Sequence, residues 1–99
     1  MLIYVTHAYR GKHSDYEKIR KIIHNLQKND LANTYICPLL VLSHMGYKEL
    51  TFEQEKELRL DMITACDKLL VVGDFSPMVE QELDFADLID MEVDYYEQV

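Results

Sequence analysis

The segment from Leu69 to Ala86, LLVVGDFSPMVEQELDFA, restricts the fold of this chain more than any other segment. It begins as an apolar run of strand length and breaks at Gly73-Asp74. It then continues as a helix in which Ser76 is the expected N-cap and Pro77 the first helical residue. We therefore expect a strand, a tight turn and a helix in direct succession.

Glu82 lies on the side of this helix that the pattern assigns to the protein interior. On a helical wheel of about 100° per residue, the apolar stripe that surrounds it consists of Val79, Leu83, Ala86 and Ile89. A charge on a buried face costs several kcal/mol unless it is paired or used. Two interpretations stay open: a salt-bridged or protonated core carboxylate, or a functional residue.

Short apolar runs and helical patterns alternate along the rest of the chain. Strands are expected at residues 2–6, 34–37, 68–73 and 92–96, with helices between them at 14–29, from 51 onward and from 77 onward. Capping boxes mark two helix starts, Ser14 with Glu17 and Thr51 with Gln54. The pattern predicts one domain over residues 1–99, an α/β fold of three layers, Rossmann-like or flavodoxin-like, around a four-stranded parallel sheet.

Composition excludes several classes of function. The 99 residues are 48% hydrophobic, which suits a single small core. A net charge of -8 argues against a nucleic-acid polymer as partner. No apolar run approaches the roughly 20 residues that span a bilayer, so we expect a cytoplasmic protein without a membrane partner. Cys37 and Cys66 are far apart and near no histidine cluster, so we expect buried thiols, with no metal site and no cofactor.

A ligand crevice is expected at the carboxyl ends of the first and third strands. Ligands of parallel sheets bind there, near the point where the strand order reverses. The residues that these two strand ends supply are Thr6, His7, Tyr9, Arg10 and Gly11, together with Asp74, Phe75 and Ser76. Glu82 follows on the second turn of the next helix, from which its side chain can reach back toward the sheet edge.

From Leu2 to about Ile89, the chain resembles the nucleoside 2-deoxyribosyltransferases and their small nucleotide N-glycosidase relatives. The opening strand and polar loop of that family look like IYVTHAYRG. Its Asp at the start of a central strand looks like Asp67 in ACDKLLVVGD, and its S-x-G-x-x-x-E segment looks like Ser76 to Glu82. Met78 departs from this pattern, because the family has Gly at that position.

The resemblance implies a role for each matched residue. Glu82 corresponds to the catalytic nucleophile, and Asp67 helps to shape the sugar or base pocket. Ser76 and the helix N-terminus, with Met78 beside them, hold a 5′ substituent. A retaining transfer needs a carboxylate that attacks the anomeric carbon and a second acidic group that protonates the departing base. A tyrosine hydroxyl, from Tyr4 or Tyr9, could orient Glu82.

The predicted ligand is therefore a nucleotide or nucleoside, and a phosphorylated ligand is favoured. Its phosphate would sit at the helix N-terminus by Ser76, with Arg10 or Lys12 supplying charge unless these are solvated loop residues. The predicted activity is cleavage or transfer of an N-glycosidic bond by Glu82. The alternative is a non-catalytic protein that sequesters a nucleotide or an ADP-ribose-like signal molecule.

A homodimer or larger assembly is also expected, because this small domain has more apolar residues than one core can cover. These residues include Tyr47, Phe52, Met62 and Tyr95. Glu55 and Arg59 lie four residues apart on the apolar side of their helix. They form either a partly exposed ion pair or part of a subunit contact.

Overall fold

Four parallel strands form the centre of the molecule. The computed structural model describes residues 1–8, 13–38 and 50–96. Its strands are β1 (Leu2–His7), β2 (Thr34–Ile36), β3 (Lys68–Val72) and β4 (Glu92–Tyr96). They are all parallel and lie in the order β2-β1-β3-β4. This arrangement confirms the prediction of an α/β fold with a four-stranded parallel sheet.

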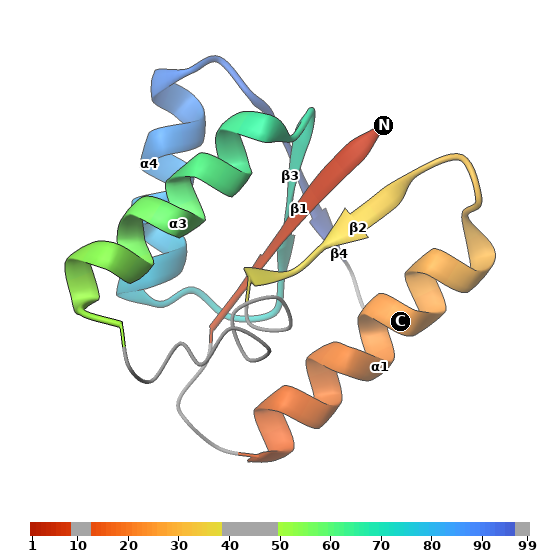
Figure 1. The fold of residues 1–99 in the computed structure, drawn as a ribbon. Coiled ribbons are helices and arrows are strands. Elements are labelled where there is room, and N and C mark those ends of the chain that lie inside the picture. Colours follow the sequence, from red (N-terminus) through yellow and green to blue (C-terminus); the bar gives the residue numbers. More distant parts are fainter. Residues whose placement is uncertain (9–12, 39–49, 97–99) are drawn as a thin grey trace.

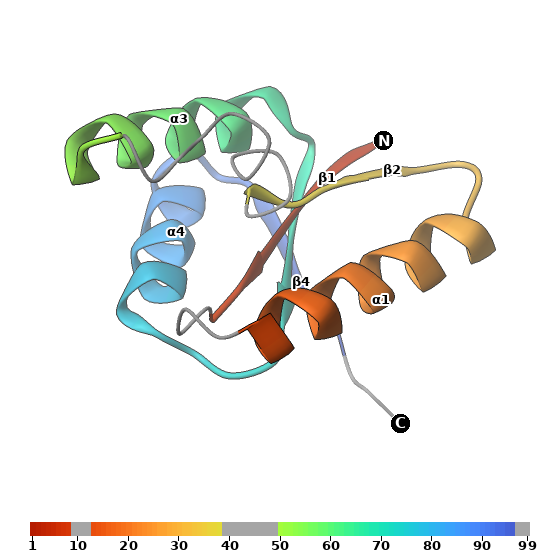
Figure 2. The ribbon, with the colours of Figure 1, turned by 60° about the horizontal axis from the view of Figure 1, so that its bottom comes forward.

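Helices cover both faces of this sheet. Helix α1 (His13–Asn29) packs on one face, whereas α3 (Phe52–Ala65) and α4 (Pro77–Leu88) lie side by side on the other, as Figures 1 and 2 show. The molecule therefore has the three layers of Rossmann-like and flavodoxin-like folds. Among the described residues, no helix is both long enough and apolar enough to cross a bilayer.

The side chains of β1 point alternately to the two faces of the sheet, and they contribute to two separate core clusters. Tyr4 faces α3 and α4 and packs with Ile63, Leu69 and Ala86. Val5 faces α1, and its cluster consists of Ile19, Ile22, Cys37 and Val72. Successive side chains of a strand point to opposite faces, so Thr6 lies on the Tyr4 side and His7 on the Val5 side. Both cysteines are buried and free, as expected.

Two helix starts agree with the sequence prediction, and one does not. Thr51 and Gln54 form the complete capping box, with each side chain accepting from the other residue's backbone N–H. Ser76 caps α4, since its Oγ accepts from the Val79 N–H at 3.2 Å. The prediction of Ser14 as an N-cap is wrong, because α1 already begins at His13.

Strand and helix ends also differ from the prediction by about one residue. Strand β1 continues to His7, where it pairs with Val72, and β2 stops at Ile36. Pro38 has no N–H and cannot extend the ladder. Ile89, which the sequence assigned to the buried stripe, is 40% exposed because α4 ends at Leu88.

The strand order reverses between β1 and β3, as predicted. From β1 the chain adds β2 on one side, then crosses back to add β3 and β4 on the other. Gly73, with φ of +78°, makes the turn after β3 in a conformation that favours glycine. The carboxyl ends of β1 and β3 therefore lie together, where a ligand site is expected.

Asp30 organises the connection between α1 and β2. Its carboxylate accepts hydrogen bonds from the Asn33 side chain at 2.7 Å, the Tyr35 hydroxyl at 2.8 Å and the Ala32 N–H at 3.2 Å. These bonds, from Asn33 first and Tyr35 second, lower the pKa of Asp30. Because the folded state favours the ionised carboxyl, this network stabilises the fold above the ordinary pKa of 3.8.

Asp30→Asn should lower stability at neutral pH and flatten its pH dependence in acid. In the wild type, the contribution of Asp30 is lost as the pH falls through its lowered folded pKa, whereas the amide of the variant has no proton to bind. Urea unfolding at several values from pH 7 to pH 2 measures this effect. Asp61→Asn, the same change at an exposed residue, is the control. Parallel curves for Asp30→Asn and the wild type would contradict the prediction.

Candidate functional site

Glu82 is fully buried on the inner face of α4, and its carboxylate is bound by two other elements. The exposed fraction of Glu82 is 0%. Its Oε1 accepts from Arg59 Nη1 of α3 at 2.9 Å and from the Tyr4 hydroxyl of β1 at 3.0 Å. The structure thus shows the paired state of Glu82, one of the two interpretations that its position left open.

Arg59 faces the interior and forms the cationic half of this pair. It is 2% exposed, so the expected ion pair of Glu55 and Arg59 is partly exposed on its Glu55 side alone. Its Nε also lies 3.7 Å from Oε1 of Glu55, whose side chain is about one-third exposed (33%). Arg59 therefore stands between two carboxylates, one inside the fold and one near the surface.

Tyr4 is a permanent hydrogen-bond donor to Glu82. Burial raises the pKa of Tyr4 far above its ordinary value, and the negative charge of Glu82 raises it further. The hydroxyl therefore keeps its proton throughout the physiological range. Of the two tyrosines expected to orient Glu82, Tyr4 does so, while Tyr9 lies outside the described residues.

Three buried polar atoms on this side of the sheet have no hydrogen-bond partner among the described residues. They are Oε2 of Glu82, Nε of Arg59 and Oγ1 of Thr6. Thr6 follows Tyr4 by two residues on β1, so its side chain points to the same face, closer to the carboxyl edge. Buried polar groups are normally paired, and unpaired ones are typical of strained, catalytic or hydrated sites.

A hollow lies between the first turns of α3 and α4, next to this buried pair. Its volume is about 330 Å³. The lining residues are Phe52, Glu55 and Arg59 from α3 and Pro77, Met78 and Gln81 from α4. Both helices begin at the carboxyl edge of the sheet, so the hollow opens at the edge where ligands of such folds bind.

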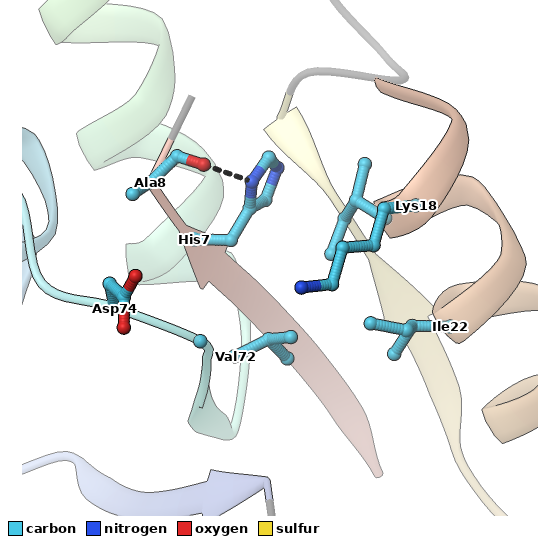
Figure 3. Close-up of a pocket in the computed structure, with 8 residues that line it drawn as sticks. His7, Ala8, Lys18, Ile22, Val72 and Asp74 are labelled. Carbon is cyan, nitrogen blue, oxygen red and sulfur yellow. Dashed lines mark hydrogen bonds between the residues drawn. The ribbon is translucent and has the colours of Figure 1, made fainter. Parts of the chain in front are cut away.

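A second pocket, of about 100 Å³, lies at the same edge on the α1 face. Figure 3 shows Lys18 extending from α1 into this pocket, with His7 and Asp74 across from it. His7 is 6% exposed, and its Nδ1–H donates to the Ala8 carbonyl oxygen at 3.1 Å. A carbonyl only accepts, so this bond places a proton on Nδ1.

The structure brings most of the predicted site residues to the carboxyl edge. Thr6 and His7 end β1, Asp74 follows β3, Ser76 caps α4, and Met78 lines the hollow. Tyr9, Arg10 and Gly11 lie outside the described residues.

Asp67 lies at the opposite edge of the sheet. Its Oδ2 accepts from the Leu2 N–H at 2.7 Å, and its own N–H donates to the Leu2 carbonyl oxygen at 2.7 Å. Leu2 and His7 are five residues apart on β1, which corresponds to about 16 Å in a strand. The observed contacts of Asp67 join the start of β3 to the start of β1 and do not bring it to Glu82.

Sequence reasoning missed Arg59 as the partner of Glu82 and Lys18 as a pocket residue. A signal for Arg59 was present, because it is a cation on an apolar helix face and Glu82 is an anion on another. Buried charges of opposite sign tend to pair. Lys18 carries no comparable signal, since it is one of several lysines on α1.

Comparisons of the chain with protein-family models, with curated proteins and with solved structures give no match. Likeness to the nucleoside 2-deoxyribosyltransferases therefore stays a hypothesis. The described residues contain no cluster of three or more His, Cys, Asp or Glu side chains that could hold a metal ion.

The buried pair of Arg59 and Glu82 should show strong energetic coupling. Arg59→Met and Glu82→Leu each leave one buried charge without its partner, which should cost about 3–5 kcal/mol of unfolding free energy. The double variant removes both charges and should cost clearly less than the sum of the two single changes. Urea unfolding of all four proteins completes the cycle. Additivity within about 0.5 kcal/mol would contradict the coupling.

Proposed function

We propose that the protein binds a nucleotide-type ligand, N-ribosylated and phosphorylated, and cleaves or transfers its N-glycosidic bond with Glu82 as the nucleophile. The observation that carries this proposal is the uneven use of the two carboxylate oxygens. Both donors bind Oε1, and Oε2 has no partner among the described residues although it is buried.

The surroundings of Glu82 meet three requirements of a carboxylate nucleophile. Its negative charge needs a partner inside the protein, and Nη1 of Arg59 lies 2.9 Å from Oε1. It must be held in one orientation, which two donors from different elements achieve. One oxygen must also be left to react. A carboxylate that served only the fold would be better stabilised with both oxygens paired, since each can accept two hydrogen bonds.

The proposed chemistry follows from this arrangement. Oε2 of Glu82 attacks the anomeric carbon, the bond from carbon to the base nitrogen breaks, and the base leaves with its electron pair and takes up a proton. Water or another hydroxyl then attacks the same carbon. It gives up a proton, and the ester electron pair returns to Oε2. A retained sugar configuration is expected, because two displacements occur at one carbon.

The position of Glu82 in the fold supports the same function. It lies on the second turn of the helix that leaves β3, and β3 and β1 flank the point where strand order reverses. Thr6 supplies a buried hydroxyl on the same face that has no hydrogen-bond partner among the described residues. Ligands of parallel sheets bind at this place in the fold.

Sequestration without chemistry is the second candidate, and the first turn of α4 favours it. Pro77 donates no N–H, and Met78 stands where the resembling family has glycine. Both features limit the approach of a phosphate to the backbone there. Full burial of Glu82 also fits a carboxylate that stays paired.

Glu82→Gln should keep ligand binding and abolish nearly all base release. The amide preserves the shape of the side chain but is not a nucleophile. Chromatography of reactions with nucleoside monophosphates, dinucleotides and ADP-ribose-type molecules measures release of free base. A ligand at 100 times its Kd should add about 2.7 kcal/mol to stability, which thermal unfolding detects as a shift of several degrees.

Glu80→Gln is the matched control, because Glu80 is an exposed residue of the same helix. This variant should release base at the wild-type rate. A thermal shift without base release from the wild type would favour sequestration. The absence of both, across the whole panel, would contradict both candidates.

We also propose that the protein assembles as a homodimer or larger. Several apolar side chains are exposed, including Phe52 at 68%, Leu88 at 79% and Tyr95 at 59%. Scattered exposed apolar residues are normal, so the proposal depends on their number in so small a domain. Light scattering after size exclusion should give at least twice the chain mass of 11.7 kDa. A monomer at high micromolar concentration would contradict this.

A further inference from the structure

We infer that the hollow between the first turns of α3 and α4 is an anion subsite, in which a ligand phosphate replaces Glu55 as the outer partner of Arg59. Identifying this anion as the phosphate of a ribosyl ligand rests on the proposed function. Binding of an anion in the hollow does not depend on that function and is tested separately below.

The guanidinium of Arg59 has hydrogen-bonding capacity that the fold does not use. Arginine presents five N–H donors in a planar fork. Nη1 donates to Glu82, whereas Nε is buried and has no hydrogen-bond partner among the described residues. Glu55 Oε1 lies 3.7 Å from Nε, which is too far for a hydrogen bond. The outer side of this cation is therefore incompletely satisfied, although Arg59 is only 2% exposed.

Arg59 lines the hollow together with Glu55, the carboxylate that lies close to its unpaired Nε. Pro77 and Met78, at the start of α4, line it as well. Two helices begin at its rim, so the positive ends of two helix dipoles lie beside the cation. Glu55 shows that negative charge is accepted here, because its carboxylate already lies close to Nε.

A phosphate would bind Arg59 better than Glu55 does. Arginine and phosphate form charge-assisted, often bidentate hydrogen bonds, which the Glu55 geometry does not achieve. Glu55 is one-third exposed, so its side chain can turn into solvent when a ligand enters. The hollow, at about 330 Å³, has room for a phosphate group together with part of a larger molecule.

This assignment has a consequence for the proposed reaction. One guanidinium would hold both the nucleophile, through Oε1 of Glu82, and the anionic end of the ligand. The phosphate would then fix the distance of the sugar from Oε2. The compensating cation would be Arg59 of α3, whereas Arg10 and Lys12, which the sequence suggested for this role, lie outside the described residues.

Binding of inorganic phosphate to Glu55→Gln, measured by isothermal titration calorimetry at low salt, tests the subsite. This variant removes the competing carboxylate, so phosphate should bind about fivefold more tightly than to the wild type. Glu53→Gln is the matched control. It makes the same change of charge in the same helical turn, but Glu53 is exposed and has no ion pair with Arg59 among the described contacts. Its affinity should change by less than about twofold.

A second variant tests the role of the guanidinium fork. Arg59→Lys in the Glu55→Gln background keeps the positive charge but loses the planar set of donors, so phosphate affinity should fall back at least to the wild-type level. Thermal unfolding confirms that each variant is folded. Equal phosphate affinities for Glu55→Gln and Glu53→Gln, or no phosphate binding to Glu55→Gln, would overturn the inference.

The two proposals can fail separately. Phosphate binding with the expected variant pattern, together with no base release by the wild type, would support the anion subsite and contradict the glycosidase function. Base release by the wild type, together with equal phosphate affinities for Glu55→Gln and Glu53→Gln, would support the glycosidase function and contradict the anion subsite.

Discussion

A buried ion pair with a tyrosine beside it joins three elements of this fold. Arg59 of α3, Glu82 of α4 and Tyr4 of β1 meet at a single carboxylate oxygen, and all three residues are at most 2% exposed. Removing two charges from water is costly, and their attraction repays this cost only when the geometry is good. The packing of α3 against α4 over the sheet therefore depends on the position of these side chains.

Several polar atoms in and beside this ion pair form no hydrogen bond with a described residue. Oε2 of Glu82, Nε of Arg59 and Oγ1 of Thr6 are buried without hydrogen-bond partners among the described residues. A fold selected for stability alone would pair these atoms or replace them with apolar groups. Their occurrence near the carboxyl edge, where the strand order reverses, is what connects the stability of this region with a proposed chemical function.

Local sequence signals determined the architecture. Apolar runs of strand length, the Thr51 capping box and the Ser76–Pro77 helix start act over a few residues, so they predicted where each described element begins to within about one residue. The same helical periodicity that identified α4 also predicted the burial of Glu82. Ser14 was misplaced, because a capping pattern does not show which residue begins the helix.

Only the tertiary structure decided which side chains meet. Tyr4 and Glu82 are 78 residues apart and Arg59 and Glu82 are 23 apart, so their contacts depend on strand register and helix placement together. The sequence marked Glu82 and Arg59 as charges on apolar faces but could not pair them. The resemblance assigned Asp67 to the ligand pocket, but Asp67 precedes β3 whereas His7 ends β1, so in a parallel sheet the two residues lie at opposite edges. Periodicity determines what is buried, whereas the packing of distant elements determines what a buried charge can do.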